Sequence, residues 1–113
     1  MKKTFLFIFL TIPVFLFAQE PTKNQRKNAE KISNYVAEKH SLNNKDKLFF
    51  YEATLNQIVT NAAKIKKQGI TDSEAKKVVY REGYNNIRAA LSKKFGNQKA
   101  MALLKSGNEA RRQ

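Results

Sequence analysis

An apolar stripe in residues 45–68 constrains the fold more than any other feature of the sequence. Apolar side chains recur there at alternating steps of three and four residues, at Leu48, Tyr51, Leu55, Ile58, Ala62 and Ile65. This is the heptad spacing of a helix that packs along another helix. We therefore predict a long helix over residues 45–68, with this stripe facing a partner helix.

Signals that end one helix and begin the next stand side by side directly after this stripe. Gly69 can take the left-handed conformation that ends a helix, and Ile70 stands where a Schellman motif places its hydrophobic contact. Thr71 and Glu74 have the spacing of a capping box for the following helix. Because the connection is so short, the pattern predicts a tight antiparallel helical hairpin, with its second helix over residues 72–95.

The second helix of this hairpin carries its own apolar side. We expect its buried positions to be Ala75, Val79, Tyr80, Tyr84, Ile87, Leu91 and Phe95. Gly83 weakens the middle of the helix, because an interior glycine costs about 1 kcal/mol relative to alanine. A kink at Gly83 is therefore an open question at this point.

Shorter helices flank the hairpin. Thr22 can cap a helix over residues 23–39, and a short fourth helix is expected over residues 97–105. Residues 106–113 are typical of a frayed basic tail. Strand-like alternation and nucleotide-binding glycine motifs are absent from the sequence. The predicted fold class is therefore all-α: a long antiparallel helical hairpin with a shorter N-terminal helix and a short C-terminal helix.

The first 18 residues have the pattern of a cleaved signal peptide. Two lysines precede an apolar run over residues 5–17, and the small residue Ala18 follows it. Cleavage is expected between Ala18 and Gln19, which leaves residues 19–113 as a single small helical domain, periplasmic or secreted. The alternative is an uncleaved membrane anchor, but the apolar run is shorter than the roughly 20 residues that a membrane-spanning helix needs.

The charge of the chain favours anionic partners. The sequence has 22 basic and 9 acidic residues, and removing the two leader lysines leaves 20 against 9, a formal charge of +11. Lipid head groups, cell-envelope polymers, nucleic acid and acidic unfolded chains would all be attracted. Nucleic acid is disfavoured because no nucleic-acid motif accompanies the charge and export is expected. Without cysteine, disulfides cannot stabilise so small a domain, which makes homodimerisation a reasonable source of extra burial.

The sequence offers no constellation for catalysis. His40 is the only histidine, and without cysteines or a second imidazole it does not make a transition-metal site. The carboxylates are scattered along the helices rather than paired. We therefore predict no catalytic, cofactor or metal site, and a protein that is not an enzyme.

Basic residues gather on both sides of the predicted hairpin turn. Antiparallel packing would bring six of them toward one end of the hairpin: Lys64, Lys66, Lys67, Lys76, Lys77 and Arg81. One interpretation is an anion-binding surface. The other is a solvated face that keeps an exported protein soluble.

Three consecutive aromatic residues raise a separate question. At 100° per residue, Tyr51 belongs to the apolar stripe, Phe50 lies on its flank, and Phe49 points roughly 150° away from its centre. The predicted hairpin partner cannot cover Phe49. Either the first helix covers this ring, or Phe49 and Phe50 form an apolar contact for a second copy or a client. The residues available on the first helix are Ile32, Tyr35 and Val36.

The arrangement of residues 30–105 resembles the LTxxQ-repeat family of periplasmic stress proteins, the Spy/CpxP-like group. Residues 42–46 (LNNKD) stand where the first motif of that family begins a helix, and residues 91–98 (LSKKFGNQ) occupy the region of the second. The resemblance implies a dimeric helical cradle. Such a cradle holds unfolded proteins without ATP, on a concave surface that combines positive charge with apolar patches.

These observations lead to one main hypothesis and two alternatives. The main hypothesis is an exported, non-enzymatic protein, chaperone-like, that binds partly unfolded or anionic protein surfaces. In the first alternative the protein is envelope-associated and binds anionic lipid or polymer. In the second it is a structural subunit recognised by one specific partner.

Overall fold

The computed structural model describes residues 20–113, and this part of the chain is helical without strands. The all-α prediction is confirmed. The helices are α2 (Lys23–His40), α3 (Asn44–Lys67), α4 (Ser73–Phe95) and α5 (Asn97–Arg111). The predicted signal peptide and both residues of its cleavage site, Ala18 and Gln19, lie outside the described residues. None of the helices in residues 20–113 is long and apolar enough to span a membrane.

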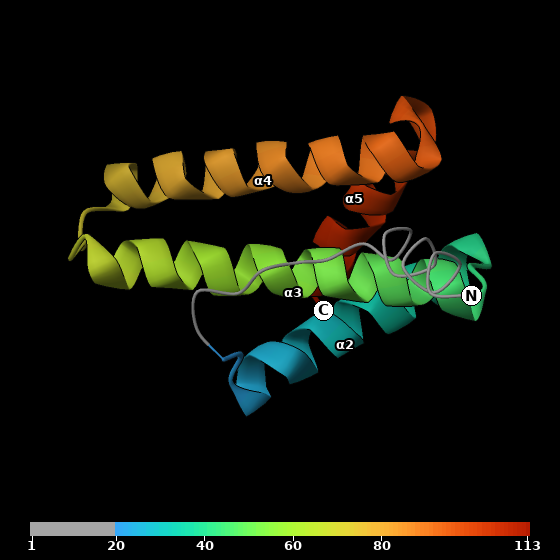
Figure 1. The fold of residues 1–113 in the computed structure, drawn as a ribbon, viewed down its shortest axis with the longest axis horizontal. Coiled ribbons are helices and arrows are strands. Elements are labelled where there is room, and N and C mark those ends of the chain that lie inside the picture. The colour runs from blue at the N-terminus through green and yellow to red at the C-terminus, as the bar shows by residue number, and fades with distance from the viewer. Residues whose placement is uncertain (1–19) are drawn as a thin grey trace, which may run out of the picture.

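The two long helices, α3 and α4, lie side by side, and the shorter helices α2 and α5 pack against them (Figure 1). Helix α2 lies obliquely along α3, while α5 turns back from the end of α4 and packs against both α4 and α2. Each helix therefore has two neighbours along its backbone. The main core lies where the four helices converge, around Phe50, Leu91 and Leu103, each at most 1 % exposed.

The helix ends near residue 70 confirm one capping prediction and correct another. Gly69 has a φ of 61°, and the Ile70 amide donates to the Ile65 carbonyl at 3.0 Å, as in a Schellman motif. The predicted capping box of Thr71 and Glu74 is wrong by one residue. Asp72 is the N-cap of α4, and its carboxylate accepts from the Ala75 amide at 3.0 Å. A carboxylate at this end is also favoured by the helix dipole.

Helix α4 is continuous through Gly83, and glycine at this position serves close packing. Gly83 is buried, and a Cβ there would overlap the side-chain amide of Asn61 on α3. The predicted buried side of α4 is largely confirmed by Val79, Ile87 and Leu91, each at most 5 % exposed. Tyr80 is an exception at 50 % exposure, so its prediction as a buried residue is wrong.

The predicted buried stripe of α3 is wrong at Leu48 and Ala62. Leu48 is 56 % exposed and Ala62 is also exposed, whereas Leu55 near the middle is buried. The residue at the centre of the core is instead Phe50, at 1 % exposure. The physical reason is that α3 contacts neighbours on several sides: its backbone packs against α2 and α4, and the Phe50 ring also reaches Gly107 on α5.

The predicted frayed tail from residue 106 is also wrong, because α5 continues to Arg111. Ser106, Gly107 and Ala110 are buried in its last turns. A Cβ added at Gly107 would lie 3.6 Å from the Phe50 ring, so only small residues allow α5 to approach so closely. Low helix propensity in this segment therefore accompanies tight packing rather than disorder.

Candidate ligand-binding groove

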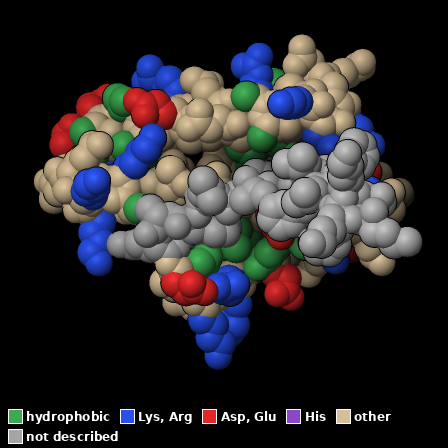
Figure 2. All heavy atoms as spheres, viewed as in Figure 1, with side chains coloured by type: hydrophobic (Ala, Val, Ile, Leu, Met, Phe, Trp, Pro, Cys, Tyr) green, Lys and Arg blue, Asp and Glu red, His purple; other side chains and the backbone are tan. Residues whose placement is uncertain are grey.

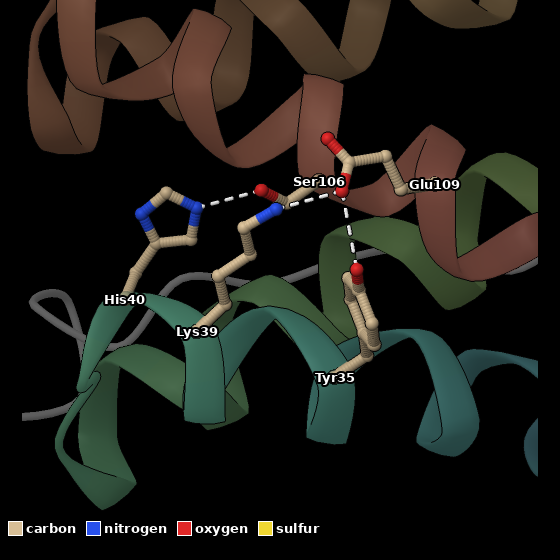
Figure 3. Close-up of polar contacts among 5 residues, drawn as sticks. All are labelled: Tyr35, Lys39, His40, Ser106 and Glu109. Carbon is tan, nitrogen blue, oxygen red and sulfur yellow. Dashed lines mark hydrogen bonds and ion pairs between the residues drawn. The ribbon is translucent and has the colours of Figure 1, made fainter.

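Polar contacts that the sequence did not predict fasten α5 to α2 (Figure 3). The Glu109 carboxylate accepts from the Lys39 ammonium at 2.7 Å and from the Tyr35 hydroxyl at 3.1 Å. These hydrogen bonds, above all the one from Lys39, lower the pKa of Glu109, and the same bond raises the pKa of Lys39. The contact holds the last turns of α5 against α2 while remaining partly open to solvent.

A histidine and a serine meet in the same region. His40 Nε2 lies 2.8 Å from Ser106 Oγ (Figure 3). Nucleophilic catalysis by such a pair requires an accessible hydroxyl and a third group that orients the imidazole. Ser106 is only 3 % exposed in the middle of α5, and the nearby Glu109 carboxylate is bound to Lys39 and Tyr35. We therefore interpret the pair as a structural link between α2 and α5.

A groove of about 590 Å³ lies between the four helices. Its floor comes mainly from the C-terminal half of α3, with contributions from α2 and α5. The apolar residues that line it are Ile32, Ile58, Ala62, Ile65, Tyr80 and Ala110. The side-chain amides of Asn28 and Asn61 also face it. A volume between 300 and 1,000 Å³ is typical of ligand-binding sites, and half of the residues that line this groove are apolar.

Four cationic side chains line this groove, one from each helix: Lys31, Lys66, Lys76 and Arg111. None of the described residues that line it is acidic. The Lys31 ammonium donates to a main-chain oxygen of Gln113 at 2.7 Å, and the Arg111 guanidinium donates to Gln57 Oε1 at 2.9 Å. The Gln57 side-chain amide is neutral, so this hydrogen bond orients the Arg111 guanidinium without cancelling its charge. Burial of the guanidinium lowers the pKa of Arg111.

The structure divides the six predicted anion-binding residues into three groups. Lys66 and Lys76 line the groove. Lys64 and Lys77 form exposed ion pairs, with Glu82 at 3.4 Å and Glu74 at 3.3 Å respectively. The remaining two, Lys67 and Arg81, are exposed outside the groove.

Positive charge is not confined to the end of α3 and α4 where the connection between them lies. On the face seen in Figure 2, Lys and Arg side chains are spread around the periphery, with carboxylates among them. Charge alone therefore does not mark a site on this face. The groove is distinguished because the described residues that line it combine cations with apolar side chains and include no Asp or Glu.

The predicted apolar contact at Phe50 is wrong, because this ring is enclosed by the protein's own core. Phe49 is partly buried and packs edge-on against Phe95 of α4, with a centroid distance of 5.9 Å. The Lys94 ammonium lies 5.6 Å from the centre of the Phe49 ring. Because α4 is the helix predicted as the hairpin partner, the prediction that this partner cannot cover Phe49 is wrong: Phe95, the last residue of α4, reaches the ring. An apolar binding surface has to be sought in the groove instead.

Sequence reasoning missed two of the four groove cations, Lys31 and Arg111. Arg111 fell in the segment predicted to be frayed, and Lys31 lies on a helix whose docking was left open. The sequence does contain one signal for the longer helix. Ser106, Gly107 and Ala110 are small residues at a spacing that permits close helix packing, and this pattern would have placed the predicted end of the last helix beyond residue 105.

Residues 20–113 contain no group of three or more histidine, cysteine, aspartate or glutamate side chains placed to hold a metal ion. No protein-family model, curated protein or solved structure matches the chain. The resemblance to the LTxxQ-repeat family therefore stays a prediction, and the groove is the feature from which function can be argued.

Proposed function

We propose that this is an exported, non-enzymatic binding protein that holds anionic, partly unfolded protein segments, with the groove between the helices as its contact surface. In this proposal α3 and α4 form a long antiparallel hairpin that supports the groove, and α2 and α5 complete its walls. The single observation that carries the proposal is the lining of the groove by residues 20–113, which combines an apolar floor with four cations and includes no acidic residue in that range.

The groove suits such segments on physical grounds. An unfolded chain presents apolar side chains and carboxylates close together, and the groove offers partners for both. Long-range attraction by the net positive charge would speed encounter, and apolar contact with the floor would then hold the segment. Tyr80 is half-exposed at the edge of the groove, where an aromatic side chain can cover an apolar group of the client.

The experiment measures suppression of aggregation of a denatured acidic client by residues 19–113, at low and at moderate salt. We expect suppression at both, and weaker suppression at moderate salt because screening reduces the attraction. Absence of suppression at both salt concentrations would refute the proposal.

A matched pair of variants separates the groove from general charge. Lys66→Gln/Lys76→Gln removes two charges inside the groove, and Lys67→Gln/Arg81→Gln removes two charges at the same end outside it. The first variant should lose most of the suppression and the second should retain it. Equal loss in both would assign the effect to net charge. Binding to anionic but not neutral vesicles, without client protection, would favour the lipid-binding alternative.

A further inference from the structure

The groove has the size and chemistry of a small-molecule site as well as of a protein contact. We propose that it binds a small amphiphilic anion, an aliphatic chain that ends in a carboxylate. The volume of about 590 Å³ lies within the range of ligand pockets. This inference uses the same groove as the proposed function but does not depend on client binding.

The floor provides a place for the aliphatic chain. Ile58, Ala62 and Ile65 follow one another along α3, and Ile58 packs against the main core at the inner end. Eight residues separate Ile58 from Lys66, so the floor extends over about 12 Å at 1.5 Å per residue. Ile32 and Ala110 add apolar surface at the inner end. A flexible aliphatic chain can follow such a floor without needing hydrogen-bond partners.

The cations indicate where the carboxylate lies. At the inner end, Lys31 and Arg111 already donate to oxygen atoms of the protein, a main-chain oxygen of Gln113 and Gln57 Oε1. At the outer end, the charged groups of Lys66 and Lys76 make no hydrogen bond or ion pair with another residue in the range 20–113. An anion that contacts these ammonium groups would neutralise charge that no other residue in this range offsets. We therefore place the carboxylate at Lys66 and Lys76 and the chain along α3.

The test uses decanoate below its micelle concentration, with binding to residues 19–113 followed by calorimetry and by amide chemical shifts. Decanol and decyltrimethylammonium are the probes with the same chain and a neutral or cationic head. We expect saturable decanoate binding that is at least about tenfold tighter than binding of either control, because only the carboxylate accepts hydrogen bonds from the ammonium groups as an opposite charge. Equal binding of the three probes would overturn the proposal.

Four variants locate the site. Lys66→Gln/Lys76→Gln should weaken decanoate binding about tenfold or more, whereas Lys31→Gln should weaken it less. Ala62→Phe fills the floor at an exposed position and should abolish binding, while Ala89→Phe places the same ring on an exposed position of α4 outside the groove and should not. Helical circular dichroism checks that each variant is folded. Undiminished binding to Ala62→Phe would overturn the proposal.

The two proposals fail separately. Client protection without decanoate binding would overturn only this inference. Decanoate binding without client protection would refute only the proposed function.

Discussion

The close approach of α3 and α4 at Gly83 leads to a quantitative prediction about stability. Replacing Gly83 by alanine has two opposing effects. In a helix interior alanine is favoured over glycine by about 1 kcal/mol. In this helix, however, the added Cβ would lie 2.9 Å from both Cγ and Nδ2 of Asn61, well inside the 3.5–4.0 Å of optimal contact between carbon atoms.

The expected balance follows from these two effects. Overpacking of this kind costs typically about 1–3 kcal/mol, so Gly83→Ala should lower the free energy of unfolding by about 1 kcal/mol net. When Asn61→Ala removes the obstructing amide, the same change should instead raise it by about 1 kcal/mol, since only the helix preference remains. The predicted coupling between the two positions is therefore about 2 kcal/mol.

Urea denaturation of the wild type, the two single variants and the double variant measures this coupling directly. Thermal denaturation provides a second readout, because 1 kcal/mol corresponds to about 4–8 °C for a domain of this size. If Gly83→Ala stabilises the protein equally in both backgrounds, the Asn61 side chain rotates away at no cost. The argument that glycine is needed for close helix packing would then be refuted.

Three further predictions concern the core and the link between α2 and α5. Phe50→Ala should lower the free energy of unfolding by about 3–5 kcal/mol, and Phe49→Ala by clearly less because that ring is only partly buried; equal losses in urea denaturation would contradict the assignment of Phe50 to the core. Thr54→Val should raise the free energy of unfolding by about 1 kcal/mol, since the buried Thr54 hydroxyl has no hydrogen-bond partner among residues 20–113; a loss of stability would mean that the hydroxyl is satisfied. Folding lowers the pKa of the Glu109 carboxyl. The ionised carboxylate therefore stabilises the protein at pH values above the pKa of this group in the unfolded chain, and this stabilisation is lost as the pH falls through its pKa in the folded protein. Denaturation between about pH 5 and about pH 3 should therefore show a smaller loss of stability in Glu109→Gln than in the wild type, and identical pH dependence would contradict this contribution.

Local signals were sufficient to predict much of the helical structure. The end of α3 at Gly69 follows from the preference of glycine for positive φ and from a single apolar residue after it, both readable within a few positions. The boundaries of α2 and α4 were likewise predicted to within a residue. These features depend on neighbours in the sequence and not on tertiary packing.

The faces of the helices depend on neighbours in space, and there the prediction failed. The heptad argument assumed that α3 has one partner, so it placed Tyr51 in the seam and Phe50 on the flank. In the structure the three adjacent rings meet different surroundings. Phe49 meets the end of α4, Phe50 enters the main core, and Tyr51 packs near Ala29 of α2.

The groove could not be predicted because four helices form it. Lys66 and Lys76 were among the six basic residues predicted to lie near the turn, but Lys31 and Arg111 lie far from them in sequence. Only the docking of α2 and α5 brings these four cations around one apolar floor. The net charge of the sequence predicts that a partner is anionic, but it does not predict which surface of the protein the partner contacts.

The most direct test of the groove as the binding surface is amide chemical-shift mapping of residues 19–113 during titration with an unfolded acidic client. The largest shifts should fall along the groove, at Ile58, Ala62, Ile65 and Tyr80. Shifts concentrated instead at the opposite end, around Leu48, Phe49 and Phe95, or spread evenly over the exposed lysines, would contradict the groove as the site of binding.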